Sequence, residues 1–271
     1  MKLDFIGIGP MRAGTSWLHH ALSLHPGVSL PREKETFYFD RYFERGPAWY
    51  AAHFDAENPR AMRGEIGASY FSSEEALDRI HDVSPNAKLI VSLRDPVERA
   101  FSTFIHLSKY QRLPHELERA LKAEPLILDS GRYSLHLPRW EARFGAERVY
   151  LFHLESAIDR PLAEVNALLD WLGLEPLRVD EEALREPKNE GFVARSYAYQ
   201  RLSDFVFRFL ADNHHFNTLN ALRTLKRRGE ALLGRGRSMS TERRMTDAER
   251  ALLIERLEPE YAFLRARGVE F

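Results

Sequence analysis

The first residues whose types and spacing could do chemistry lie near the N-terminus, in the stretch GIGPMRAGTSW. Gly9 and Gly14 are separated by four residues, as in the pattern G-x-x-x-x-G-K-[ST], whose backbone amides bind phosphate. The apolar run 3–8 has the length of a strand, and residues 15–24 have helical spacing. Since backbone amides at a helix start attract anions, this strand, loop and helix predict a phosphate site.

The loop lacks the lysine of that pattern, because Thr15 follows Gly14. Its basic residue is Arg12, two residues before the glycine. In nucleoside-triphosphate enzymes, lysine and Mg²⁺ together neutralise the charge on the β- and γ-phosphates. A donor whose transferred group carries one negative charge needs less, and a sulfuryl group on an adenylate phosphate fits this description.

A second candidate site follows the most strand-like segment, KLIVSL at 88–93. The segment is apolar on both faces, which is typical of a central parallel strand, and a helix should begin at Pro96. Arg94 ends the strand and Ser102 lies about two turns into the helix, so both can face the crevice where open sheets bind ligands. Alternatively, Arg94 pairs with Asp95, or Asp95 holds Mg²⁺ in a kinase.

The two segments together resemble the nucleotide-binding motifs of sulfotransferases that use 3′-phosphoadenosine 5′-phosphosulfate (PAPS). PMRAGTSWL (10–18) is similar to their 5′-phosphosulfate loop, and VSLRDPVERAFSTF (91–104) is similar to their 3′-phosphate segment. KETFYFD (34–40), GEIGASYF (64–71) and SGRYSLHLPRW (130–140) are similar to heparan sulfate-type and bacterial members. The resemblance covers the first 170 or so residues and implies PAPS as donor, adenosine 3′,5′-bisphosphate (PAP) as product, and no metal.

The resemblance also implies roles for individual residues. Arg12 stands where the family has lysine and would stabilise charge on the leaving group, electrostatically because a guanidinium is a poor proton donor. Arg132 and Tyr133 would approach the adenosine, and Arg235 and Arg237 would close on the 3′-phosphate. The expected nucleotide-binding residues are Arg12, Ala13, Gly14, Thr15, Ser16, Trp17, Arg94, Ser102, Arg132, Tyr133, Arg235 and Arg237.

Three residues compete for the role of general base. Glu35 matches the glutamate of the 3-O-sulfotransferases, and Glu65 matches that of the N-sulfotransferases. His106 lies four residues after Ser102, on the same helical face, as a histidine does in the N-sulfotransferase type. Phe37 and Ile66 replace a histidine and a lysine of those relatives, so we expect a less anionic acceptor than heparan sulfate.

The rest of the chain predicts the scaffold. Strands are expected at 63–66 and 149–152, and helices at 72–82, opened by a Ser72–Glu75 capping box, and at 96–110, 135–144, 161–172, 197–213 and 246–267. The alternation implies a doubly wound, mostly parallel α/β sheet with flanking helices, like that of P-loop NTPases. We expect a single domain, 1–271, with a helical and loop C-terminal extension from about 173, which contains a basic segment at 223–244.

The composition excludes several classes of function. A formal net charge of −1 and 44% hydrophobic residues are those of a soluble enzyme and argue against a nucleic-acid binder. The absence of cysteine removes disulfides and thiolate chemistry. We expect a cytoplasmic enzyme without a membrane span that acts on a small-molecule, lipid or glycan acceptor. A P-loop-type kinase and a non-catalytic nucleotide-binding protein are the alternatives.

Overall fold

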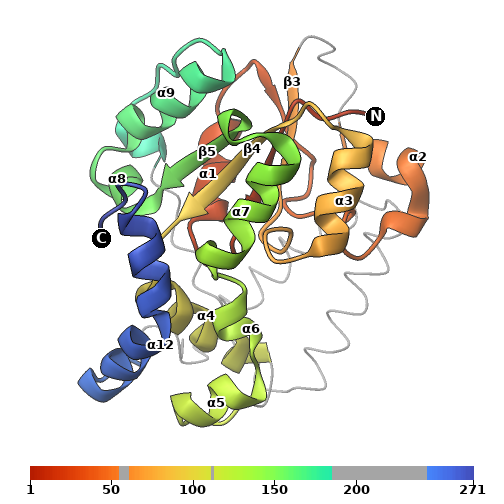
Figure 1. Ribbon diagram of the computed structural model, residues 1–271. Coiled ribbons are helices and arrows are strands. Elements are labelled where there is room, and N and C mark those ends of the chain that lie inside the picture. Colours follow the sequence, from red (N-terminus) through yellow and green to blue (C-terminus); the bar gives the residue numbers. More distant parts are fainter. Residues whose placement is uncertain (55–60, 111–112, 185–242) are drawn as a thin grey trace, which may run out of the picture. The chain divides into compact units, whose positions relative to one another are not determined.

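The structure is a computed structural model that describes residues 1–54, 61–110, 113–184 and 243–271 (Figure 1). The elements below belong to one compact unit, Met1–Pro187 together with Met245–Phe271. The predicted helix at 197–213 and the predicted ligands Arg235 and Arg237 lie outside the described residues. No helix of the described ranges is both long enough and apolar enough to cross a membrane.

A five-stranded parallel sheet forms the centre, with the strand order β2-β3-β1-β4-β5. The strands are β1 (Phe5–Gly9), β2 (Val28–Ser29), β3 (Met62–Ile66), β4 (Lys88–Leu93) and β5 (Val149–His153). From β1 the chain runs first to one side of the sheet and later to the other, so β1 and β4 flank the point where the order reverses. In open sheets, ligands bind at this point, beyond the carboxyl ends of the strands.

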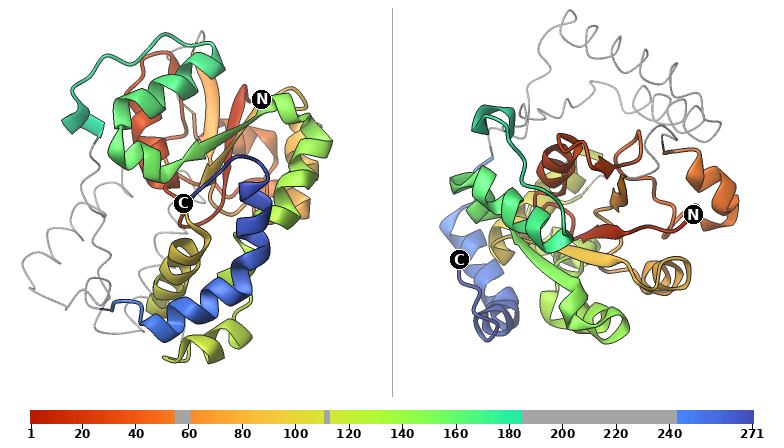
Figure 2. Two further views of the ribbon diagram at one scale, coloured as in Figure 1. Left: turned by 60° about the vertical axis from the view of Figure 1, so that its left-hand side comes forward. Right: turned by 90° about the horizontal axis from the view of Figure 1, so that it is seen from above.

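Alternating side chains of each strand face two apolar layers. Phe5, Ile66, Ile90 and Phe152 pack against α1 (Thr15–Ser23), α8 (Leu154–Asp159) and α9 (Pro161–Leu172). The opposite face packs against α2 (Gly46–Ala51), α3 (Glu74–Val83) and α7 (Tyr133–Phe144). Seen from above in Figure 2, α1 lies on one side of the strands, and α3 and α7 lie on the other.

A third cluster extends beyond the carboxyl ends of the strands. It joins α4 (Pro96–Tyr110), α5 (Leu117–Ala123) and α6 (Leu126–Asp129) to the C-terminal helix α12 (Asp247–Arg265). Figures 1 and 2 show α12 running alongside α4 and reaching α7, and both pairs of helices are in contact. The C-terminal helix thus packs against α4, which begins just after Arg94, and against α7.

The structure confirms the predicted doubly wound parallel sheet, and several boundaries match within one or two residues. The predicted strand at 88–93 and the helices at 96–110 and 161–172 have the observed bounds. The predicted capping box at Ser72 is wrong: Ser73 is the N-cap of α3, and its hydroxyl accepts a hydrogen bond from the Ala76 amide. Thr246 instead forms a capping box, with Glu249, at the start of α12.

Candidate active site

The loop between β1 and α1 offers free helix-terminal amides to an anion. Gly14 is the N-cap of α1, and no side chain caps this end of the helix. The first turn contains no acidic residue. Gly14 has φ +83°, and a Cβ there would lie 2.5 Å from Leu154, so only glycine fits. Uncapped N–H groups at a helix start can bind an anion, so this geometry is compatible with the phosphate site that the sequence predicts.

The two sequence-predicted nucleotide segments meet at Arg12. The Arg12 Nε donates a hydrogen bond to the Ser102 hydroxyl on α4, at 3.0 Å. The Arg94 Nη1, at the end of β4, donates to the Arg12 carbonyl oxygen, also at 3.0 Å. Residues that are more than eighty positions apart in the sequence therefore lie next to one another beyond the carboxyl ends of β1 and β4.

Backbone strain marks the same region. In the described part of the chain, the non-glycine residues with positive φ are Arg12 (66°), Glu35 (66°) and Phe37 (52°). A left-handed conformation costs an ordinary residue about 1–2 kcal/mol, and such strain concentrates at functional sites. Two of the three are residues that the sequence put forward for catalysis.

Glu35 lies over the end of β3, next to the loop between β1 and α1. Its Oε1 accepts hydrogen bonds from the Lys34 ammonium at 3.0 Å and from the Ala68 amide at 3.2 Å. The Ala68 backbone packs so closely on Gly9 that a Cβ at Gly9 would lie 2.6 Å from the Ala68 oxygen. The side chain of Glu35 is 24% exposed, so this carboxylate can be reached by a substrate.

Glu65, the other candidate glutamate, is the centre of a buried hydrogen-bond network. It has no exposed surface, and burial raises the pKa of its carboxyl group. It accepts hydrogen bonds from the Thr36 amide at 3.1 Å and hydroxyl at 2.6 Å, and from the Tyr50 and Tyr70 hydroxyls at 2.5 and 2.8 Å. These bonds anchor the loop that carries Glu35 to β3.

His19 is a residue of this site that the sequence analysis did not single out. Burial and the charges of Lys34 and His20 lower the pKa of its imidazole to about 4, and the charge of Glu35 opposes this shift. Its Nε2 is buried and has no hydrogen-bond partner within the described ranges. His19 lies four residues after Thr15 on α1, so the two side chains share one face of the helix. This spacing could have identified His19 from the sequence.

The remaining predicted residues differ in how exposed their side chains are. The Trp17 ring stacks on Phe152, with 5.7 Å between the ring centroids. His106 is half-buried on α4, and Arg132, at the start of α7, is half-exposed beside Asp129. Tyr133 is fully buried, and its hydroxyl lies 3.2 Å from the Arg94 amide, whose hydrogen it accepts.

Asp95, which the kinase alternative would use for Mg²⁺, has structural partners on both carboxylate oxygens. Its Oδ1 accepts from the Glu98 amide at 2.8 Å and so caps α4. Its Oδ2 accepts from the Tyr261 hydroxyl at 2.7 Å. Among the residues that the structure describes, no group of three or more histidine, aspartate or glutamate side chains could hold a metal ion.

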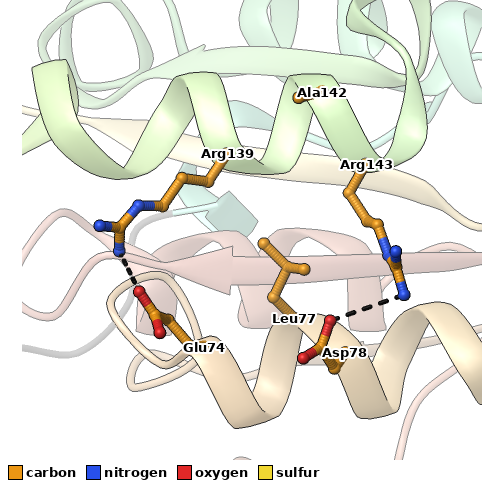
Figure 3. A pocket seen from close by; sticks show the side chains of 6 residues that line it. All are labelled: Glu74, Leu77, Asp78, Arg139, Ala142 and Arg143. Carbon is orange, nitrogen blue, oxygen red and sulfur yellow. Dashed lines mark hydrogen bonds and ion pairs between the residues drawn. The ribbon is translucent and has the colours of Figure 1, made fainter.

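A surface groove of about 330 Å³ lies between α3 and α7 (Figure 3). Two ion pairs span it, from Arg139 to Glu74 at 2.7 Å and from Arg143 to Asp78 at 3.6 Å. None of the sequence-predicted site residues lines this groove.

Comparisons with known proteins agree with this geometry. Residues 71–178, which include Arg94 and Ser102, match the model of the sulfotransferase family. This matched segment is similar to that family. It is 35% identical over 186 residues to human heparan sulfate glucosamine 3-O-sulfotransferase 6, a match that covers 64% of this chain and 53% of the relative. It is 39% identical over 137 residues to the Dictyostelium discoideum membrane-associated sulfotransferase kil1, covering 47% and 29% of the two chains.

The chain spans about half the length of the human relative and less than a third of the Dictyostelium one. Among solved structures, a sulfotransferase from Alicyclobacillus acidocaldarius has the same fold, with a TM-score of 0.60 and 24% identity. That match covers 82% of this chain and 96% of the other. The comparisons support the family and the fold, and they assign no role to a single residue.

The position of His19 predicts a pH-dependent loss of stability. Its folded-state pKa of about 4 lies below the ordinary histidine value of 6.5, so the unfolded chain binds the proton more tightly. The stability contributed by neutral His19 is complete above pH 6.5 and is lost as the pH falls toward 4. Between pH 7 and 4.5 the parent should lose about 2 kcal/mol more than His19→Gln, less than the full pKa difference implies because the ring is not completely buried.

Thermal or urea unfolding of both proteins across this pH range measures the difference. The other titratable groups are the same in the two proteins, so their contributions to the pH dependence of stability cancel in the comparison. Parallel pH profiles for the parent and His19→Gln would show that His19 is not buried in its neutral form.

Proposed function

We propose that this protein is a sulfotransferase that binds PAPS beside the carboxyl ends of β1 and β4 and transfers the sulfuryl group to an acceptor hydroxyl, less readily to an amine. The observation that carries the proposal is the meeting of the two nucleotide segments through Arg12, Ser102 and Arg94. One segment supplies helix-terminal amides and the other an arginine, which together suit a nucleotide with two separate phosphate groups.

The residues present fit such a nucleotide. The uncapped start of α1 would hold the 5′-phosphosulfate, with the hydroxyls of Thr15 and Ser16 nearby. Arg94 uses one of its five N–H donors on the Arg12 carbonyl, and a planar guanidinium at that place suits the 3′-phosphate. The Ser102 hydroxyl, already bonded to Arg12, would contact the same phosphate.

In this arrangement each side chain has a definite task. The acceptor oxygen attacks sulfur as the bond from sulfur to the bridging oxygen of the donor breaks, and PAP leaves. The loop amides and Arg12 stabilise the negative charge that develops on the leaving phosphate. Glu35 accepts the acceptor's proton, because it is the reachable carboxylate, whereas Glu65 is buried under four hydrogen bonds.

The acceptor is a small molecule, a lipid or a glycan. The human relative is named for heparan sulfate glucosamine, which makes a sugar hydroxyl a natural first choice. Phe37, beside Glu35, lies 4.5 Å below the Arg41 guanidinium. An aromatic residue at this place favours an acceptor that carries less charge than heparan sulfate.

Calorimetry with three nucleotides tests the nucleotide site. The parent should bind PAP more tightly than adenosine 5′-phosphate or ATP. Arg94→Ala should weaken PAP binding about 10- to 100-fold, the effect of about 1.5–3 kcal/mol from lost charge-assisted hydrogen bonds, and leave adenosine 5′-phosphate nearly unchanged. Arg139→Ala is the matched control, since it removes the same charge from the groove between α3 and α7, which none of the proposed site residues lines (Figure 3).

Two results would overturn the nucleotide assignment. If ATP binds more tightly than PAP and requires Mg²⁺, the result supports a P-loop-type kinase instead. If Arg94→Ala and the parent bind PAP equally, Arg94 does not hold the 3′-phosphate. A parent that binds PAP but transfers no ³⁵S-labelled sulfate to a panel of alcohols, phenols, sugars and amines would be a non-catalytic nucleotide-binding protein.

Paired glutamine variants test the choice of base. Glu35→Gln should slow sulfate transfer to the best acceptor of the panel by about 10²–10⁴-fold and leave PAP binding and the melting temperature unchanged. Glu65→Gln should lower the melting temperature, because it disturbs the buried network, and keep most of the transfer rate. The reverse pattern, with an active Glu35→Gln and a stable but inactive Glu65→Gln, would move the base to Glu65.

A further inference from the structure

Two adjacent residues of the C-terminal helix α12 contact the two segments that adjoin Arg94. The Tyr261 hydroxyl donates to the Asp95 Oδ2 at 2.7 Å. The Glu260 carboxylate accepts from the Ser134 amide at 2.7 Å and from the Ser134 hydroxyl at 2.8 Å. Glu260 is only 3% exposed, so its charge is buried against the start of α7. One helix turn thus binds the first turns of two other helices.

Both contacts lead directly to Arg94. Asp95 follows Arg94 in the chain and caps α4 through the Glu98 amide. Ser134 follows Tyr133, whose hydroxyl accepts from the Arg94 amide at 3.2 Å and lies 3.4 Å from the Arg94 carbonyl oxygen, to which it can donate. The backbone of Arg94 is therefore fixed on one side through Asp95 and on the other through Tyr133.

A buried arginine holds the turn at residues 127–131, which precedes α7. Arg99 is fully buried and donates to the Ser130 hydroxyl and to the Ile127 and Leu128 carbonyl oxygens, at 2.9–3.2 Å. A Cβ at Gly131 would lie 1.9 Å from the Arg99 Nε, so the turn packs directly on the guanidinium. The turn that precedes Ser134 is thus held in place by Arg99, and Glu260 fixes the first turn of α7 that follows it.

We infer that Glu260 and Tyr261 are positioning residues for the 3′-phosphate site: α12 sets the place of Arg94 relative to the phosphate loop and so determines the preference for nucleotides with a 3′-phosphate. This inference rests on the proposed function. The two residues act through Arg94 and touch no part of the nucleotide themselves. A packing role alone would affect all nucleotides equally, whereas a role in placing Arg94 affects only those with a 3′-phosphate.

The test compares the dissociation constants of PAP and adenosine 5′-phosphate by calorimetry on the full chain. Tyr261→Phe keeps the ring and removes the hydroxyl. We expect its constant for PAP to rise about 3- to 10-fold, a size typical of indirect coupling, and its constant for adenosine 5′-phosphate to change less than about twofold. Arg250→Ala is the control, since it removes an exposed ion pair between α12 and Glu98 of α4 and should leave both constants unchanged.

A second pair of variants keeps the test decisive if Tyr261→Phe does not fold. Glu260→Ala should lower the preference for PAP, while Glu260→Gln should largely restore it, because an amide can still accept from the Ser134 amide and donate to its hydroxyl.

The outcomes separate the two claims. If the parent binds PAP no better than adenosine 5′-phosphate, the proposed function fails. If the parent prefers PAP and Tyr261→Phe or Glu260→Ala shows the same preference, or loses affinity for both nucleotides equally, the positioning role is wrong.

Discussion

The hydrogen bond from Arg94 to the Arg12 carbonyl oxygen is the contact on which the site depends. It joins the loops that follow β1 and β4, the two strands beside the point where the sheet order reverses. Without it, the sheet would still offer a helix start at one strand and a cation at another, but nothing would fix the distance between them. A nucleotide with two phosphates needs that distance to be set before it binds.

Buried charges hold the surrounding loops in place, at a cost in desolvation. Glu65 and Arg99 have no exposed surface, and the carboxylate of Glu65 and the two terminal nitrogens of Arg99 are bonded to several neutral partners rather than to a single opposite charge. Such networks are costly to build and highly directional, because every unpaired donor or acceptor would be penalised. Glu65 fixes the loop that carries Glu35, and Arg99 fixes the turn before α7. The strained backbone at Glu35 is tolerated because this frame holds it.

The elements with strong local signals could be predicted from the sequence. The apolar segment 88–93 and the helix that begins at Pro96 have the predicted bounds, because propensity, capping and burial agree there. The places of the two candidate nucleotide segments were also predictable, since one directly follows β1 and the other directly follows β4. Short elements such as α2, α5 and α6 were missed, because a helix of four to seven residues has too little periodicity to be recognised.

Other features depend on contacts that local patterns do not encode. The sequence alone does not distinguish Glu35 from Glu65 as the general base. Only the fold shows that Glu35 is partly exposed and that Glu65 is enclosed by Thr36 and two tyrosines. Tyr261 lies 166 residues from its partner Asp95, so no spacing rule could pair them. The predicted ligands Arg235 and Arg237 lie outside the described residues and stay predictions.

A crystal structure of this chain with PAP tests the central claim most directly. We expect the 5′-phosphate at the amides of residues 13–16 and the 3′-phosphate against Arg94 and Ser102, with Glu35 beside the space next to the 5′-phosphate. A nucleotide bound elsewhere, or one whose two phosphates do not bridge the loops after β1 and β4, would contradict the account.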